Sequence, residues 1–221
     1  MVPDSPRNAF RRERRRMVRR QLRSRGIRDA RVLAAMAWVP RERFVAPALQ
    51  DEAYDDMPLR TSHGQTISQP YIVALMTAEA RLTRHSRVLE IGTGTGYHTA
   101  VLANLALAVW SVERFAEMSQ EAGARLADLG VTNVTLVVGD GAQGHAPEAP
   151  YQAIVVTAAV PAPPARLLNQ LDLGGRLVIP VGDLATQDLM IYERTPAGYE
   201  ATSAGPCRFV PLVSPAAFEE R

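Results

Sequence analysis

The chain has 221 residues, 47% of them hydrophobic and 22% charged, which are the proportions of an ordinary soluble globular protein. This length accommodates one large α/β domain with small additions and leaves little room for a second full domain. No segment approaches the roughly 20 apolar residues that cross a bilayer, and the Arg-rich N-terminus lacks the apolar core of a secretory signal. Cys207 is the single cysteine and the four histidines are scattered, so we expect a cytoplasmic protein without disulfides and without a metal site.

The basic residues are all arginines, and they are concentrated at one end of the chain. Residues 1–31 contain twelve Arg and three acidic residues, a net charge of +9, which leaves −7 for the remaining 190 residues. Clustered Arg can neutralise nucleic-acid phosphates. However, Met17, Val18 and Leu22 lie on one face of the expected helix, and no aromatic residues are interleaved for base stacking. We therefore favour an exposed amphipathic helix over a nucleic-acid-binding segment.

Residues 10–70 are expected to form a small helical addition that ends in a polar loop, after a loose tail at residues 1–9. Helical or mixed elements are predicted at residues 10–25, 30–37 and 41–53. Gly26 stops the first helix, and Asp29 can cap the second. Residues 60–70 are dense in hydroxyl and amide side chains, which either face water or bind a ligand.

Strands and helices alternate through most of the remaining sequence, residues 71–221. Strands are predicted at residues 87–91, 109–112, 134–138, 153–156 and 176–179. Helices are predicted at residues 71–82, 99–106, 115–129 and 164–171. This alternation implies an α/β fold with a doubly wound, mostly parallel Rossmann-like sheet. Three further strands, at residues 188–194, 199–202 and 208–213, follow one another without helices, which predicts antiparallel C-terminal strands.

The sequence VLEIGTGTGY, at residues 88–97, predicts a strand, a glycine turn and the start of a helix. Its three glycines let a ligand approach the backbone, and the helix behind them presents unpaired N–H groups. A dinucleotide-binding fold would have G-x-G-x-x-G, but Tyr97 occupies the position of the third glycine. The pattern is instead acid-x-G-x-G-x-G with Glu90 as the acid. It resembles the first motif of the S-adenosylmethionine-dependent methyltransferases.

Residues that end the other strands are also candidates, because ligands of open α/β sheets bind beyond the carboxyl ends of the strands. Glu113, which follows Gly96 by seventeen residues and precedes Arg114, can accept hydrogen bonds from both hydroxyls of a ribose. Asp140 can accept one from an adenine amino group, and Gly141 lets the base approach the backbone. Each acid alone can be a solvated residue, but three such features at successive strand ends favour a cofactor site.

Further motifs make the chain similar to one family of methyltransferases. They are RERFV (residues 41–45), HGQTISQPY (63–71), SVER (111–114), GDG (139–141), VVTAA (155–159), GGRLVIPVG (174–182) and RFVPL (208–212). Together with the glycine turn they resemble the protein-L-isoaspartate (D-aspartate) O-methyltransferases over about residues 17–213. QTISQP is specific to that family, whereas other methyltransferases share only the glycine motif.

The resemblance implies that residues 71–221 bind S-adenosylmethionine and form a single compact unit with residues 10–70. It implies transfer of a methyl group to the α-carboxylate of L-isoaspartyl residues in damaged proteins, with S-adenosylhomocysteine as product; the ester then closes to a succinimide, which initiates repair. It also implies Ser68 as the catalytic residue. Cofactor contacts are expected at Thr66, Ile67, Ser68, Glu90, Gly92, Thr93, Gly94, Gly96, Tyr97, Glu113, Arg114, Asp140 and Gly141. One departure is Arg60-Thr61-Ser62, where bacterial members usually have Pro-Ile-Gly, and it puts the shape of the loop in doubt.

These residue types suit methyl transfer to a carboxylate. A carboxylate has an unperturbed pKa near 4, so it is ionised at neutral pH and needs no general base. Its oxygen must be held in line with the sulfonium methyl at roughly 3–3.5 Å, and such positioning supplies about 7–11 kcal/mol. Ser68 would orient the acceptor rather than attack it, because no His at motif spacing activates it. A serine before Pro70 can equally be a helix N-cap.

Two other functions stay open. Related enzymes methylate aspartate in peptide natural products, although they tend to carry extra C-terminal sequence. A non-catalytic cofactor-binding regulatory or nucleic-acid module would use the Arg-rich N-terminus. A nicotinamide oxidoreductase is disfavoured by Tyr97 and by the lack of an acid/base near the glycine turn. We expect isoaspartyl proteins and peptides as partners, with no membrane, while the sequence leaves the oligomeric state undetermined.

Overall fold

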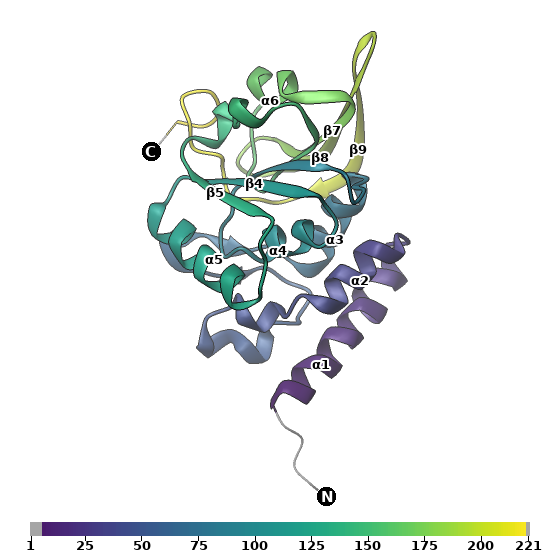
Figure 1. Cartoon of the computed structure of the whole chain (residues 1–221), viewed down its shortest axis with the longest axis vertical. Helices are drawn as coiled ribbons and strands as arrows, with labels where there is room; N and C mark the ends of the chain where they lie inside the picture. The colour runs from purple at the N-terminus through teal and green to yellow at the C-terminus, as the bar shows by residue number, and fades with distance from the viewer. Residues whose placement is uncertain (1–5, 220–221) are drawn as a thin grey trace, which may run out of the picture.

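A seven-stranded sheet forms the centre of the computed structural model, which describes residues 6–219 (Figure 1). The strands are β3 (Arg87–Ile91), β4 (Ala108–Glu113), β5 (Val134–Val138), β6 (Tyr151–Val156), β7 (Leu171–Gly182), β8 (Gln187–Thr195) and β9 (Gly198–Cys207). Their order is β5-β4-β3-β6-β7-β8-β9, with β3 to β7 parallel and with β8 and β9 antiparallel to their neighbours. The predicted doubly wound, mostly parallel sheet is therefore confirmed. The strand order reverses between β3 and β6, and ligands bind at such a switch point.

Helices cover both faces of the sheet, which explains why its parallel strands are apolar on both sides. They are α3 (Pro70–Glu79), α4 (Tyr97–Ala103), α5 (Ala116–Asp128) and α6 (Ala165–Asn169). Figure 1 shows α3, α4 and α5 below the sheet and α6 above it. In β3, Val88 lies in one apolar cluster with Met76 of α3, and Leu89 lies in another with Leu167 of α6. Because side chains alternate along a strand, Glu90 shares the face of Val88, beneath α4.

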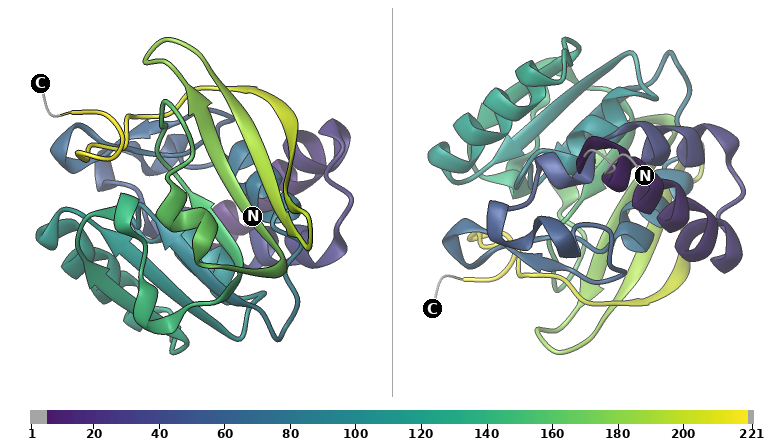
Figure 2. Two further views of the ribbon diagram at one scale, coloured as in Figure 1. Left: turned by 90° about the horizontal axis from the view of Figure 1, so that it is seen from above. Right: turned by 90° about the horizontal axis from the view of Figure 1, so that it is seen from below.

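An N-terminal helical layer packs against α3 and α4 on the side away from the sheet (Figures 1 and 2). It consists of α1 (Pro6–Met17), the π-helical turn η1 (Val18–Leu22), the 3-10 turn η2 (Arg23–Arg25) and α2 (Ala30–Trp38). The chain turns at Gly26, whose φ of 99° is left-handed. Asp29 accepts hydrogen bonds from the N–H groups of Arg31 and Val32, as its capping role predicts.

The predicted loose tail at residues 1–9 is wrong for residues 6–9, which belong to α1. Proline is well tolerated at the first position of a helix, so the helix begins at Pro6 instead of Phe10. Residues 1–5 lie outside the described residues. The division of the chain at residues 70 and 71 stays a prediction. The remaining short elements are η3 (Arg41–Arg43), η4 (Pro47–Glu52), β1 (Leu59–Arg60), η5 (Ser62–Gly64), β2 (Thr66–Ile67), η6 (Gly141–Gln143) and η7 (Ala146–Glu148).

Residues 208–213 do not form the predicted third antiparallel strand. After β9 the chain runs irregularly past the carboxyl end of β6, where the Ala159 N–H donates to Val210 O and the Leu212 N–H donates to Ala159 O, each at 2.8 Å. Pro211 lacks an N–H and cannot continue a ladder. The segment instead covers the end of the sheet at which ligands bind. No helix within residues 6–219 is long and apolar enough to cross a membrane.

Candidate active site

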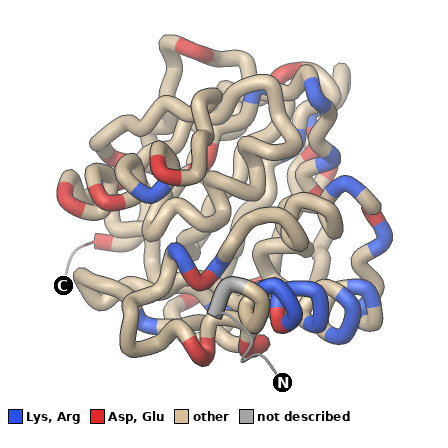
Figure 3. The backbone as a smooth tube through the Cα atoms, turned by 60° about the horizontal axis from the view of Figure 1, so that its bottom comes forward, with Lys and Arg blue, Asp and Glu red and all other residues tan. Residues whose placement is uncertain are grey.

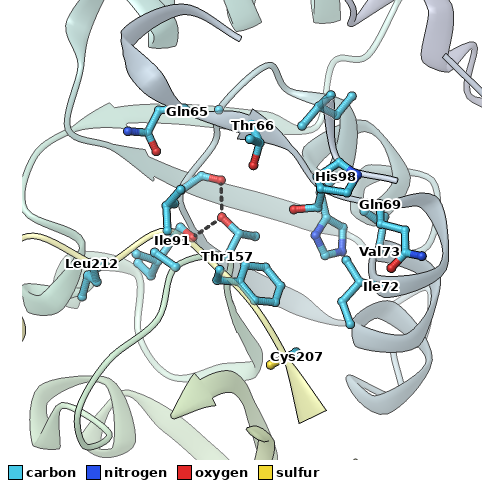
Figure 4. A pocket seen from close by; sticks show the side chains of 18 of the residues that line it. Gln65, Thr66, Gln69, Ile72, Val73, Ile91, His98, Thr157, Cys207 and Leu212 are labelled. Carbon is cyan, nitrogen blue, oxygen red and sulfur yellow. Dashed lines mark hydrogen bonds between the residues drawn. The ribbon is translucent and has the colours of Figure 1, made fainter. Parts of the chain in front are cut away.

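The glycine turn after β3 has a left-handed backbone at each glycine. Gly92, Gly94 and Gly96 have φ values of 91°, 53° and 88°, at which a residue with a Cβ is strained. A Cβ on Gly92 would lie 2.3 Å from Thr157 Oγ1. That hydroxyl lies 2.8 Å from Gly92 O and 3.0 Å from Ile91 O, as the dashed lines of Figure 4 show. Thr157, which follows β6, therefore fixes the turn from one side.

Glu113, at the end of β4, is connected to the same turn through its side chain. Its Oε2 accepts a hydrogen bond from the Gly94 N–H at 2.9 Å, and its Oε1 accepts one from the Phe115 N–H at 3.1 Å. Each carboxylate oxygen keeps a further lone pair, so two ribose hydroxyls can still be bound. The side chain is buried but lines the cavity described below. The predicted ribose acceptor is thus oriented by the backbone before any ligand binds.

Asp140, at the end of β5, is fixed by two different parts of the chain. Its Oδ1 accepts a hydrogen bond from the Ala142 N–H at 2.9 Å, and its Oδ2 accepts one from the Ser214 hydroxyl at 2.8 Å. A Cβ on Gly141 would lie 2.2 Å from Ile91 Cγ2, so only glycine fits at this position. The Ile91 side chain therefore packs directly on the backbone beside Asp140.

Glu90 lies in the protein interior rather than at the surface of the site, where a direct contact with a cofactor would be made. It is completely buried, and its Oε2 accepts hydrogen bonds from the hydroxyls of Thr99 and Ser111 at 2.5 and 2.6 Å. Ser111 Oγ lies 2.6 Å from Thr93 Oγ1, so the acid supports the glycine turn through two hydroxyls. Burial raises the pKa of Glu90 to about 7. The period of two in β3 places the Glu90 side chain on the face that α4 covers, where it bonds Thr99 of that helix.

The polar run predicted from the sequence forms a short hairpin in which Leu59 pairs with Ile67 and Arg60 pairs with Thr66. Arg60 thus takes part in regular backbone pairing, so the hairpin forms with the unusual sequence Arg60-Thr61-Ser62. At the tip of the hairpin, the His63 ring stacks on Phe115 with 4.8 Å between ring centroids. The hairpin therefore lies against the strand end that carries Glu113.

Ser68 leaves this hairpin directly before α3. It is partly buried, and its hydroxyl has no hydrogen-bond partner among residues 6–219. The N-cap residue of α3 is Gln69, which makes no side-chain capping bond, so Ser68 does not cap this helix. The hydroxyl is therefore available to a ligand.

These segments surround a cavity of about 970 Å³ (Figure 4). The predicted site residues that line it are Thr66, Ile67, Ser68, Gly92, Thr93, Gly94, Tyr97, Glu113, Arg114 and Gly141. Asp140 lines an adjoining cavity of about 540 Å³, which shares Arg114 with the first. Gly96 and Glu90 line neither of these two cavities. The space is of the size that small-molecule sites have.

Sequence reasoning missed several residues of the cavity wall. Thr157 and residues 206–213 belong to it, and the motifs VVTAA and RFVPL were the available signals. His98 also belongs to it, but a lone His on an apolar helix gave no signal. Burial lowers the pKa of His98 to about 3, so the ring is neutral at physiological pH. Its Nε2 lies 2.9 Å from Thr77 Oγ1, which connects α4 to α3.

The parallel sheet, the glycine cradle and the carboxylates at two further strand ends define an S-adenosylmethionine-dependent methyltransferase. A family model described as Protein-L-isoaspartate(D-aspartate) O-methyltransferase (PCMT) matches residues 12–217. The chain is 54% identical over 203 residues to the protein-L-isoaspartate O-methyltransferase of Methanoculleus marisnigri, covering 92% of each chain. It is 51% identical over 218 residues to that of a Synechococcus species, covering 96% of this chain and 89% of the relative.

Two solved structures that are similar to this chain have the same protein description as these relatives. A protein-L-isoaspartate O-methyltransferase superposes with a TM-score of 0.81 at 29% identity, over 92% of this chain and 67% of that one. A second, from Plasmodium falciparum in complex with S-adenosyl-L-homocysteine, superposes with a TM-score of 0.78 at 25% identity, over 90% of this chain and 98% of that one. The chain belongs to the protein-L-isoaspartate O-methyltransferase family.

Proposed function

We propose that the chain moves a methyl group from S-adenosylmethionine to the α-carboxylate of L-isoaspartyl residues in damaged proteins. The observation that carries the proposal is that one cavity joins a carboxylate-flanked glycine turn to a serine-bearing loop. When bound, S-adenosylmethionine supplies an electrophilic methyl group on a sulfonium. The protein must hold this donor and the acceptor carboxylate in one geometry and keep water out.

The cofactor contacts follow from the strand ends. Glu113 accepts hydrogen bonds from the two ribose hydroxyls, and the Asp140 carboxylate accepts one from the adenine amino group. Gly92 and Gly141 let the strand ends that carry this site pack closely, because a Cβ at either position would lie within 2.3 Å of a neighbouring side-chain atom. Glu90 contributes indirectly, by supporting the glycine turn.

The acceptor contacts come from the loop. Its carboxylate arrives ionised, so no residue has to remove a proton. The Ser68 hydroxyl donates a hydrogen bond to one carboxylate oxygen and thereby directs the other oxygen at the methyl group. Such positioning is the main catalytic contribution that we assign to the protein. The amide nitrogen of the following residue then attacks the methyl ester, which releases methanol and closes a succinimide without further catalysis. Water opens this ring in part to normal aspartate.

A labelled-methyl assay tests the proposal. A peptide containing one L-isoaspartyl residue and its aspartyl twin are each incubated with the protein and S-adenosylmethionine labelled in the methyl group. We expect incorporation into the isoaspartyl peptide alone. Incorporation into the aspartyl twin would favour an aspartate-methylating enzyme of peptide maturation, and no incorporation despite cofactor binding would favour a regulatory module.

The proposed partners are isoaspartyl-containing proteins and peptides, and the proposed location is the cytoplasm. Neither nucleic acid nor a membrane has a part in the proposal. Cell fractionation followed by the isoaspartyl-peptide assay on each fraction tests the location. Recovery of the activity with membranes would contradict it.

A further inference from the structure

The N-terminal helical layer carries an arginine face that the fold does not use. We define the basic face as Arg11, Arg15, Arg19, Arg20 and Arg23, all of them exposed. No ion pair among residues 6–219 involves any of the five. Figure 3 shows arginines following one another along this helix, whereas acidic residues are scattered over the rest of the chain. The positive end of the molecule is thus available to an external anion.

Packing does not explain the basic face. The buried side of the helix consists of Met17 and Leu22, which are at most 1% exposed. Another arginine of the segment, Arg14, does have a structural partner, since it lies 3.9 Å from Glu42 in a largely buried pair. Arg11, Arg15 and Arg19 follow one another at intervals of four residues, and like charges at that spacing destabilise a helix. The basic face therefore lowers the stability of the helix that carries it.

The helical segment that carries the basic face ends at the active-site cavity. Arg25, two residues after Arg23, lines the cavity, pairs with Asp56 at 2.5 Å and lies 3.6 Å from the centre of the Tyr71 ring. The charged side chains of the cavity lining are Arg25, Arg114, Arg208 and Glu113. Arginines outnumber acidic residues in this lining even though Arg25 is paired with Asp56, and the acceptor in the proposed reaction is a carboxylate.

We propose that the basic face is a docking surface for acidic segments of the damaged protein, so that isoaspartyl residues with Asp or Glu nearby in the sequence are preferred. This inference rests on the proposed function. A peptide whose isoaspartyl residue enters the cavity at Arg25 extends beyond the mouth, and its carboxylates meet the arginines there. Nucleic acid fits less well, because the basic face contains no aromatic side chains for base stacking.

Two isoaspartyl peptides of equal length test this inference, one with three Glu and one with three Gln beside the isoaspartyl residue. The test variant is Arg15→Gln/Arg19→Gln/Arg23→Gln. The control variant is Arg81→Gln/Arg84→Gln/Arg166→Gln, which changes three exposed arginines elsewhere and has the same net charge. Gln is a good helix former, so α1 and η1 are retained. The KM and kcat of each peptide are measured at low and at moderate salt.

We expect the test variant to raise the KM of the Glu peptide about 10-fold at low salt, since each exposed ion pair contributes a factor of about two. The KM of the Gln peptide and the kcat of both peptides stay within twofold, and the control variant behaves as the unmodified protein. Moderate salt removes the difference between the peptides.

An equal KM for the two peptides in the unmodified protein overturns the inference, and so does an equal loss for both in the test variant. Binding of a single-stranded oligonucleotide that the test variant loses, with peptide kinetics unchanged, assigns the basic face to nucleic acid instead. Failure of the proposed function is distinct, because then neither peptide is methylated.

Discussion

The two walls of the cavity differ in how firmly the protein holds them. On the cofactor wall, the glycine turn, Glu113 and Thr157 are joined by hydrogen bonds of 2.8 to 3.1 Å that involve the main chain. On the acceptor wall, a hairpin of two short strands leads to Ser68, whose hydroxyl has no partner in the described part of the chain. The cofactor wall is therefore prepared before binding, whereas the acceptor wall is completed by the substrate. Substitutions in the cofactor wall should therefore change the affinity for the donor, whereas substitutions in the acceptor wall should change turnover.

The largest effect is expected at Gly92. Gly92→Ala places a Cβ 2.3 Å from Thr157 Oγ1 in a backbone with a φ of 91°, so the turn and Thr157 can no longer keep their contact and the cofactor wall is distorted. We expect the affinity for S-adenosylhomocysteine to fall about 1000-fold, or about 4 kcal/mol, in isothermal calorimetry. Gly94→Ala is the matched control, because a Cβ there meets nothing within 4 Å and only the strained backbone opposes it. Equal affinities of the two variants would mean that the contact with Thr157 does not shape the turn.

The next largest effect concerns the acid beneath the cofactor wall. The pKa of Glu90 is raised from its ordinary 4.5 to about 7, so the folded protein retains a proton that the unfolded chain releases. The stability that this group contributes is fully present below pH 4.5 and is lost as the pH rises through 7, by about 3 kcal/mol. Glu90→Gln cannot ionise and should remove this loss. Urea denaturation of both proteins at pH 4.5, 6 and 7.5 measures it, and parallel stability curves would contradict the raised pKa.

On the acceptor wall, Ser68→Ala should lower kcat about 30-fold, or about 2 kcal/mol, because one hydrogen bond to a charged acceptor is lost. The affinity for S-adenosylhomocysteine should stay within twofold, since the cofactor wall is unchanged. Ser62→Ala, an exposed serine of the same hairpin, is the control and should change neither quantity. A loss of affinity as large as the loss of kcat would place Ser68 among the residues that hold the cofactor wall.

The smallest effect is expected where the C-terminal segment touches the cofactor wall. Ser214→Ala removes the hydroxyl that lies 2.8 Å from Asp140 Oδ2 and leaves the carboxylate less firmly placed. We expect the KM for S-adenosylmethionine to rise about 5-fold, or about 1 kcal/mol, with kcat unchanged. An unaltered KM would show that the Ala142 N–H and the Gln143 side-chain amide are sufficient to orient Asp140.

The sequence was sufficient for the parts of the site that depend on local patterns. Apolar runs marked the strands, and acids directly after them marked Glu113 and Asp140, because parallel strands bring their carboxyl ends to one edge. The antiparallel end was predicted for β8 and β9 but wrongly extended to residues 208–213. Those residues have the β-branched and aromatic composition of a strand, yet they form only isolated bridges, Pro211 with Ala159 and Val213 with Phe218, which no local pattern specifies.

The parts that could not be predicted depend on neighbours distant in the sequence. Thr157 supports the glycine turn only because β6 lies beside β3, a pairing that crosses more than sixty residues. Glu90 belongs to the expected motif, but its orientation depends on which face of β3 lies beneath α4. The basic face was correctly predicted to be exposed on a helix, although the position of Arg25 at the cavity could be known only from the fold.

A crystal structure with S-adenosylhomocysteine tests the central claim most directly. We predict that the ribose hydroxyls bind Glu113, that the adenine amino group binds Asp140, and that the sulfur faces the Ser68 hydroxyl across the cavity. A product molecule bound elsewhere, or a Ser68 side chain directed away from the sulfur, would contradict the claim that the two walls bring donor and acceptor together.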